Sequence, residues 1–254
     1  MTIDWPGVAA DAWGRWKRDR ALLLPLAGLF LFLPQFAFYL LAAPFPKLTP
    51  EQAQDTAALV APDSPLIAWI SQNAPGMLAT VLLMTFGAVA ILCLYLDREA
   101  TTPGRALTRG IGLFPRFLLA AIIAGLPAGP IELMLVILVL PCLYLLGRLM
   151  LVGPVIVAER PIGVFRAIGR SFALTRRRGL AMMALAAAMM LASMIAPAPF
   201  RILRDALQAA AAENPVAVAT TEAIGSLVAA AIGLATLLIE VALYRRLAGS
   251  SSGT

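Results

Sequence analysis

The sequence predicts an all-α membrane protein with six transmembrane helices and amphipathic surface helices on the cytoplasmic side. Of its 254 residues, 61% are hydrophobic and only 13% are charged, against about 25% charged in an ordinary soluble domain. Several uncharged runs reach the ~20 residues that a spanning helix needs. These runs are continuous and lack the alternation typical of a membrane β-barrel strand. Helices in lipid are therefore expected throughout the chain.

Six spans follow from the uncharged runs and from the charges that interrupt them. The third and fourth are joined by Pro127-Ala128-Gly129-Pro130, a sequence that favours a tight hairpin turn. We expect residues 1–20 to form a cytoplasmic amphipathic segment and residues 247–254 a disordered cytoplasmic tail, on either side of a transmembrane domain at residues 21–246. The spans are expected at about residues 21–43, 75–97, 116–127, 131–158, 179–196 and 222–244.

The distribution of Lys and Arg predicts the orientation of these spans. If the N-terminus is cytoplasmic, sixteen of the 20 basic residues lie in cytoplasmic segments, three lie outside, and Arg148 lies within the fourth span. Cytoplasmic loops of membrane proteins carry such an excess. An odd number of spans would abolish the asymmetry. The sequence therefore predicts a multi-pass protein of a bacterial-type inner membrane with both termini in the cytoplasm.

Composition also limits the chemistry. The chain has no His, which excludes Ser-His-Asp and Cys-His nucleophiles and imidazole metal ligands. Cys93 and Cys142 lie inside apolar runs, where a thiol usually behaves as a small buried hydrophobe. We therefore expect a protein that is not an enzyme and has no cofactor or metal. An intramembrane enzyme is the least favoured hypothesis, because no recognisable catalytic set is present.

Two predicted cytoplasmic segments share the pattern A-x-x-R-x-x-x-L-x-x-R and each follows a helix breaker. Spacings of three and four residues place these positions on one side of a helix, so each copy predicts an amphipathic helix on the headgroup surface. Both copies run in the same direction, which indicates a possible parallel internal repeat. The matching residues, at a constant offset of 61, are Ala106, Arg109, Leu113 and Arg116 with Ala167, Arg170, Leu174 and Arg177.

The same segments carry a basic surface that we expect to attract anionic lipid headgroups. Each cation near such a surface contributes about 1 kcal/mol. The alternative is that these residues serve only as a topology signal. Nucleic acid is not an expected partner, because the membrane already accounts for the charge. The surface comprises Arg105, Arg109, Arg116, Arg166, Arg170, Arg176, Arg177 and Arg178.

The second copy lies within a longer motif that begins at Gly153-Pro154 and ends at Thr175-Arg176. This segment resembles the membrane-domain family named after glycerophosphoryl diester phosphodiesterase, with Phe172 where the family often has Trp. The resemblance implies a polytopic membrane protein of unassigned function, and we expect the catalytic phosphodiesterase domain of some relatives to be absent. The matching positions are Pro154, Glu159, Ala167, Ser171, Leu174 and Thr175.

Arg148 and Glu240 are the two charges expected at membrane depth, and such residues are default functional candidates. They could form an ion pair between spans four and six, or extend to the membrane surface. Alternatively, Arg148 could bind an anionic lipid headgroup with Glu240 as the balancing charge. Pro25 in the first span and Pro141 in the fourth would kink their helices and could leave a cavity between spans one, four and six.

The favoured function is phospholipid engagement, in lipid handling, transport or membrane organisation, with anionic membrane lipids as partners. The alternative is a small-solute transporter or channel component. That alternative requires a polar pathway, and Arg148, Glu240 and Gln35 are few residues for one. The sequence predicts neither protein partners nor an oligomeric state.

Overall fold

The chain is a multi-pass, all-α membrane protein, so the predicted fold class is confirmed. The computed structural model describes residues 3–43, 45–46, 49, 55–59, 61–97, 99, 102–127, 136–209 and 214–251, and it assigns no strand among them. Six described helical segments are long and apolar enough to cross a membrane. They are Trp5–Leu41, Pro65–Leu96, Pro103–Gly125, Leu138–Ala158, Gly179–Leu207 and Pro215–Gly249.

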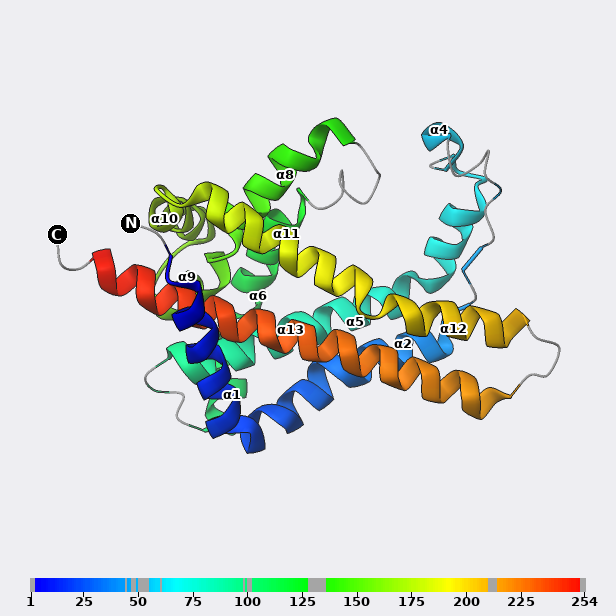
Figure 1. The fold of residues 1–254 in the computed structure, drawn as a ribbon, viewed down its shortest axis with the longest axis horizontal. Coiled ribbons are helices and arrows are strands. Elements are labelled where there is room, and N and C mark those ends of the chain that lie inside the picture. Colours follow the sequence, from blue (N-terminus) through cyan, green and yellow to red (C-terminus); the bar gives the residue numbers. More distant parts are fainter. Residues whose placement is uncertain are drawn as a thin grey trace.

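Several of the long helices lie roughly along the long axis of the molecule, whereas the first helix begins across it, and the two ends of this bundle differ (Figure 1). The start of α1 (Trp5–Ala27), the end of α13 (Pro215–Ser251), α9 (Val152–Ala158) and α10 (Val164–Thr175) lie at one end. We call this the basic end, because it also carries the predicted basic surface. The opposite end, with α12 (Ala198–Ala209), is called the far end.

The first span is longer than predicted and bent. Asp4 caps α1 by accepting a hydrogen bond from the amide of Gly7, and the helix then continues through the charged residues near position 20 without a break. Pro25 lies inside α1 and removes a backbone donor. A π-helical turn, η1 (Gly28–Phe32), and then α2 (Leu33–Leu41) follow. The predicted boundary between residues 20 and 21 is therefore not a helix boundary.

The second and third spans also begin before their predicted starts. Helix α5 (Pro65–Leu96) begins where the hydroxyl of Ser64 accepts from the amide of Ile67, so it starts well before residue 75. Helix α6 (Pro103–Gly125) is capped by Thr102 in the same way. The expected surface helix and the expected third span are thus one continuous helix. A short helix, α4 (Thr56–Leu59), precedes α5.

The fourth span is interrupted within the membrane-spanning segment. Helix α8 (Val136–Leu149) ends, two residues form a turn, and α9 continues the span. Residues 131–135 of the predicted span lie outside the described residues. After α9 come the surface helix α10, a turn, and the fifth span α11 (Gly179–Ile195).

The prediction of a disordered tail from residue 247 is wrong for the part that the structure describes. Helix α13 continues to Ser251. Leu247 is only 4% exposed and belongs to the same buried cluster as Val8 of α1, so packing against the first helix extends the last one. Residues 252–254 lie outside the described residues.

The core is built from helix pairs. Helix α5 packs mainly on α6, α8 on α11, and both α1 and α12 on α13. Helices α8 and α11 approach most closely at Gly147, where a Cβ atom would lie 2.6 Å from the backbone oxygen of Met182. Small residues permit such backbone contacts between helices in lipid. The first copy of the predicted repeat lies on α6, which packs on α5, whereas the second lies on α10, which packs mainly on α9 and α8.

Candidate functional site

Arg148 lies at the basic end of α8 and caps the surface helix α10. Its guanidinium donates to the carbonyl of Phe172 at 2.8 Å and to the carbonyl of Thr175 at 3.1 Å. It also lies over the ring of Phe172, 4.9 Å from the ring centroid. The last carbonyls of a helix have no intrahelical donor and form the negative end of its dipole. The buried guanidinium of Arg148 supplies hydrogen-bond donors to these carbonyls and a positive charge at the negative end of the dipole.

The motif residues of α10 complete this junction. The hydroxyl of Ser171 donates to the backbone carbonyl of Arg148 at 2.7 Å, and the hydroxyl of Thr175 donates to the carbonyl of Ser171 at 2.8 Å. Ala167, Ser171 and Thr175 are fully buried, and Leu174 packs against the same cluster. Pro154 is buried in α9. These motif positions hold α10 against the fourth span.

The structure does not bring Arg148 and Glu240 together. Arg148 is bound to the carbonyls of α10, and the two residues share no hydrogen bond or ion pair. Arg148 is also only 7% exposed, so a lipid headgroup would have to displace the end of α10 to reach it. The position of Arg148 is that of a structural residue.

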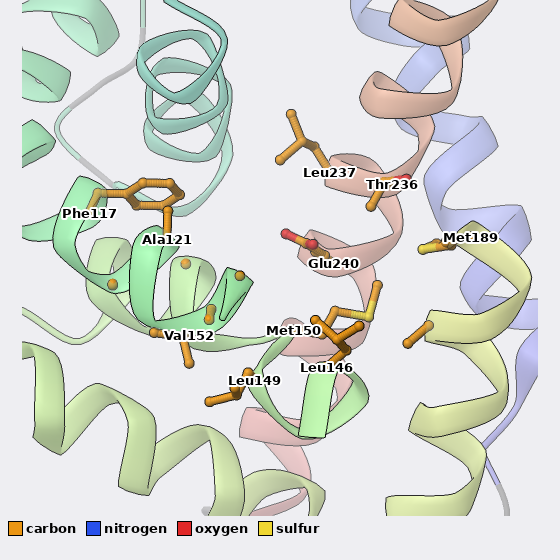
Figure 2. Close-up of a pocket in the computed structure, with 15 residues that line it drawn as sticks. Phe117, Ala121, Leu146, Leu149, Met150, Val152, Met189, Thr236, Leu237 and Glu240 are labelled. Carbon is orange, nitrogen blue, oxygen red and sulfur yellow. The ribbon is translucent and has the colours of Figure 1, made fainter. Parts of the chain in front are cut away.

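Glu240 instead borders an apolar cavity of about 390 Å³ between α6, α8, α9, α11 and α13. Its carboxylate points from α13 into the space beside α6 and α9 (Figure 2). Thr236 is the one other residue of the lining with a polar side chain, and its hydroxyl donates to the carbonyl of Ile232. The remaining lining residues are Phe117, Ala120, Ala121, Ala124, Gly125, Leu146, Leu149, Met150, Val152, Gly153, Ala186, Met189 and Leu237.

A second apolar cavity, of about 580 Å³, lies between α1, η1 and α13, and we call it the α1–α13 groove. Lys17 borders this region, with its ammonium 5.5 Å from the ring centroid of Trp13. Helical spacing places Arg20 on the same side of α1 as Trp13 and Trp16. The lining is Ala9, Ala12, Trp13, Trp16, Leu24, Ala27, Gly28, Phe32, Leu227, Ala230, Ala231, Leu234, Ala235, Leu238 and Ile239.

The sequence did not reveal this groove, because it forms between the first and last spans and depends on how they pack. The bend at Pro25 and the alanines of α13 are visible in the sequence. Neither indicates that the two segments are neighbours.

Each copy of the repeat forms an ion pair between its first arginine and an acidic residue that the sequence pattern did not include. Arg109 lies 3.9 Å from the carboxylate of Asp97 and also pairs with Glu99, whereas Arg170 lies 3.0 Å from Glu159. Asp97 and Glu159 occupy equivalent places, because each caps the end of the helix that precedes its surface helix. Glu159 also accepts from the hydroxyl of Tyr244. The signal in the sequence was an acidic residue directly after each incoming span.

The other six arginines of the predicted basic surface have side chains with no hydrogen-bond or ion-pair partner among the described residues. Five are exposed and Arg178 is half-buried. Large apolar side chains lie exposed on the same helices, including Phe165 at 78% and Ile111 at 66%. Cations beside exposed apolar side chains are typical of helices at a membrane surface. The six are Arg105, Arg116, Arg166, Arg176, Arg177 and Arg178.

The far end holds a polar contact that sequence reasoning missed. Arg204 of α12 lies 2.6 Å from Glu222 of α13 and 2.8 Å from Asp205.

In the described part of the chain, no three His, Cys, Asp or Glu side chains gather closely enough to hold a metal ion.

Comparison with known proteins gives no relative for this architecture. No protein-family model, no curated protein and no solved structure matches the chain. The described residues form a six-span integral membrane protein with two apolar cavities and an arginine-rich end.

Proposed function

We propose that this protein engages anionic phospholipid at its basic end, in lipid handling, transport or membrane organisation, without catalysing a reaction. The basic end faces the cytoplasm of a bacterial-type inner membrane in this proposal. The observation that carries it is the α1–α13 groove, an apolar cavity of about 580 Å³ with Lys17 beside it. The resemblance to the glycerophosphoryl diester phosphodiesterase membrane domain is compatible with this role.

The groove has the properties that an acyl chain requires. Its lining is entirely apolar apart from the indole nitrogens of Trp13 and Trp16. The alanines of α13 leave a shallow channel, and close packing is the main source of affinity where the surrounding solvent is itself hydrocarbon. Tryptophan favours the depth of the lipid headgroups. A lipid with its chain along α13 would therefore have its headgroup near Trp13 and Trp16.

Positive charge at the same level supports an anionic headgroup. Lys17 and Arg20 lie on the groove side of α1, and Arg20 has no ion-pair partner among the described residues. Six further arginines at the basic end are likewise unpaired, so this end of the protein retains most of its attraction for anions. The charge would therefore select the lipid class, and the groove would hold its chain.

The alternative, a small-solute transporter or channel component, has one observation in its favour, which is the carboxylate of Glu240 in the cavity of about 390 Å³. The lining of that cavity offers a polar solute only Thr236 in addition. A solute with several polar groups would leave most of them unsatisfied, which is costly at this depth. We therefore favour the lipid proposal.

The test is to fill the groove and count the lipid that remains bound. Ala235→Phe places a ring in the groove, whereas Ala184→Phe adds the same ring to an exposed site on α11 that lines neither large cavity. Native mass spectrometry of protein taken from phosphatidylglycerol nanodiscs should show bound phosphatidylglycerol in the wild type and in Ala184→Phe, and much less in Ala235→Phe. Lys17→Gln with Arg20→Gln should reduce the preference for phosphatidylglycerol over phosphatidylcholine. Equal retention in all variants would refute the proposal.

A further inference from the structure

We propose that the cavity around Glu240 is a binding site for a hydrophobic cation, a ligand with an apolar body and a single positive charge. This site shares helix α13 with the α1–α13 groove but has no lining residue in common with it, and its ligand would carry the opposite charge. The inference therefore does not depend on the lipid proposal.

The first argument is the unpartnered carboxylate. Glu240 forms no hydrogen bond or ion pair with any described residue, although it lies within the span α13. A charge at this depth costs several kcal/mol unless it is paired or hydrated. The other fourteen lining residues carry no charge, and Arg148, the one arginine of α8, is bound to α10. A cationic ligand would supply the missing partner.

The second argument is the size and lining of the cavity. Its volume of about 390 Å³ falls within the roughly 300–1,000 Å³ of typical small-molecule sites. Met150 and Met189 contribute flexible, polarisable side chains that adapt to irregular ligands, and Phe117 contributes an aromatic ring (Figure 2). These side chains suit an apolar body around the charge.

The third argument is selectivity. A zwitterion or an anion would place negative charge near Glu240 in a setting of low polarity, where repulsion is strong. A ligand with several hydrogen-bonding groups would find only Thr236. The site therefore favours a single, poorly hydrated cation, such as a quaternary ammonium or phosphonium with hydrophobic substituents.

The experiment compares two ions of the same shape and opposite charge, tetraphenylphosphonium and tetraphenylborate, by equilibrium dialysis against the purified full-length protein in detergent. Glu240→Gln should weaken tetraphenylphosphonium binding by at least about tenfold, as expected for loss of a close charge pair. It should not weaken tetraphenylborate binding, because the substitution removes a repulsive charge. Glu222→Gln is the matched control. It removes a carboxylate from the same helix outside the cavity, and Arg204 keeps Asp205 as a partner. This control should bind tetraphenylphosphonium like the wild type.

A second measurement uses the wild-type protein and does not depend on the folding of a variant. Dicyclohexylcarbodiimide reacts with carboxyl groups in apolar surroundings, and mass spectrometry of peptides locates the adduct. Tetraphenylphosphonium should protect Glu240 from this reaction, and tetraphenylborate should not. Equal binding by the wild type and Glu240→Gln, or modification of Glu240 that is unaffected by tetraphenylphosphonium, would overturn the proposal.

Discussion

The guanidinium of Arg160 lies 3.3 Å from the carboxylate of Asp97. Asp97 ends the incoming span of the first repeat copy, and Arg160 follows the incoming span of the second. The same carboxylate faces Arg109 at 3.9 Å, while Arg160 also approaches the sulfur of Cys93 at 3.6 Å. One acidic residue thus connects the two helix pairs at the basic end.

Arg160→Gln should destabilise the protein by about 1–3 kcal/mol, because it leaves the largely buried carboxylate of Asp97 with only the longer ion pair to Arg109 and the hydrogen bond from the amide of Glu99. Thermal unfolding in detergent measures the effect. Arg166→Gln, which removes an exposed and unpaired arginine nearby, should stay within about 0.5 kcal/mol of the wild type. Equal stability of the two variants would show that the Arg160–Asp97 contact does not hold the pairs together.

Arg148→Met should cost about 1–3 kcal/mol, because it removes two buried, charge-assisted hydrogen bonds to the end of α10. The carbonyl of Thr175 would keep only the amide of Arg178 as a donor, and that of Phe172 the more distant hydroxyl of Thr175. Arg148→Lys should cost less, since it keeps the charge near the negative end of the helix. When Arg148→Met is combined with Glu240→Gln, the two changes in the free energy of unfolding should add to within about 0.5 kcal/mol, as for residues that do not interact. A rescue of Arg148→Met by Glu240→Gln in this double-mutant cycle would instead reveal the ion pair expected from the sequence.

Docking of the start of α1 should weaken in acid. The hydrogen bond from Arg246, helped by the amide of Gly7, lowers the pKa of Asp4 below its ordinary value of 3.8. A group with a lowered pKa stabilises the fold above its unfolded value and loses that contribution as the pH falls through the lowered one. The protection of the first turns of α1 against hydrogen exchange, relative to the intrinsic exchange rate at each pH, should therefore fall as the pH is lowered below about 4.

Arg246→Gln is the control for this pH effect. The variant lacks the main cause of the lowered pKa, so its protection should be lower at neutral pH and should change less on acidification. Protection in the wild type that is insensitive to acid would mean that the Arg246–Asp4 contact does not dock α1.

Labelling should place the two ends of the bundle on opposite sides of the membrane. Cys93 and Cys142 are buried, so the native protein is a low background for thiol reagents. Cysteines at the exposed positions Asp63 and Gly249 should react with a membrane-impermeant maleimide from opposite sides in oriented vesicles, with Gly249→Cys accessible from the cytoplasm. Labelling of both from one side would contradict the six-span topology.

The unpaired arginines should attract anionic lipid more than the paired ones. Arg176→Gln with Arg177→Gln should lower selectivity for phosphatidylglycerol over phosphatidylcholine by up to about thirtyfold, given about 1 kcal/mol per surface cation. Arg109→Gln with Arg170→Gln removes the same charge from residues already bound to carboxylates, so its effect should be smaller.

High ionic strength should reduce both effects on lipid selectivity, because exposed charges are screened. The measurement is the lipid composition retained by each purified variant at low and high salt. If the two double variants behave alike, the internal ion pairs do not determine which arginines meet lipid.

The number of spans could be predicted because an apolar run of sufficient length has one stable solution in lipid. The helix ends could not, because a helix continues into water wherever its backbone hydrogen bonds and caps allow, as at Ser64 and Thr102. Surface helix and span are therefore continuous in α6, although the sequence predicted a boundary near Arg116.

The candidate site was only partly visible in the sequence. Composition alone identified Glu240 as an unusual charge at membrane depth, but its surroundings come from four other helix segments that pattern reasoning could not assemble. Asp97 was missed for a different reason. It lies just after a span, where charges are common, and its importance depends on Arg160, which lies far along the chain.

The packing of α1 on α13 has a consequence for biosynthesis. Arg246 bonds to Asp11 across a sequence separation of 235 residues, so the first helix enters the membrane long before its main partner has been made. Until then, the apolar faces that later line the groove have only lipid, or the insertion machinery, to contact. Contacts between distant segments form late and slowly, which makes closure of the bundle by its last helix the natural final step of assembly.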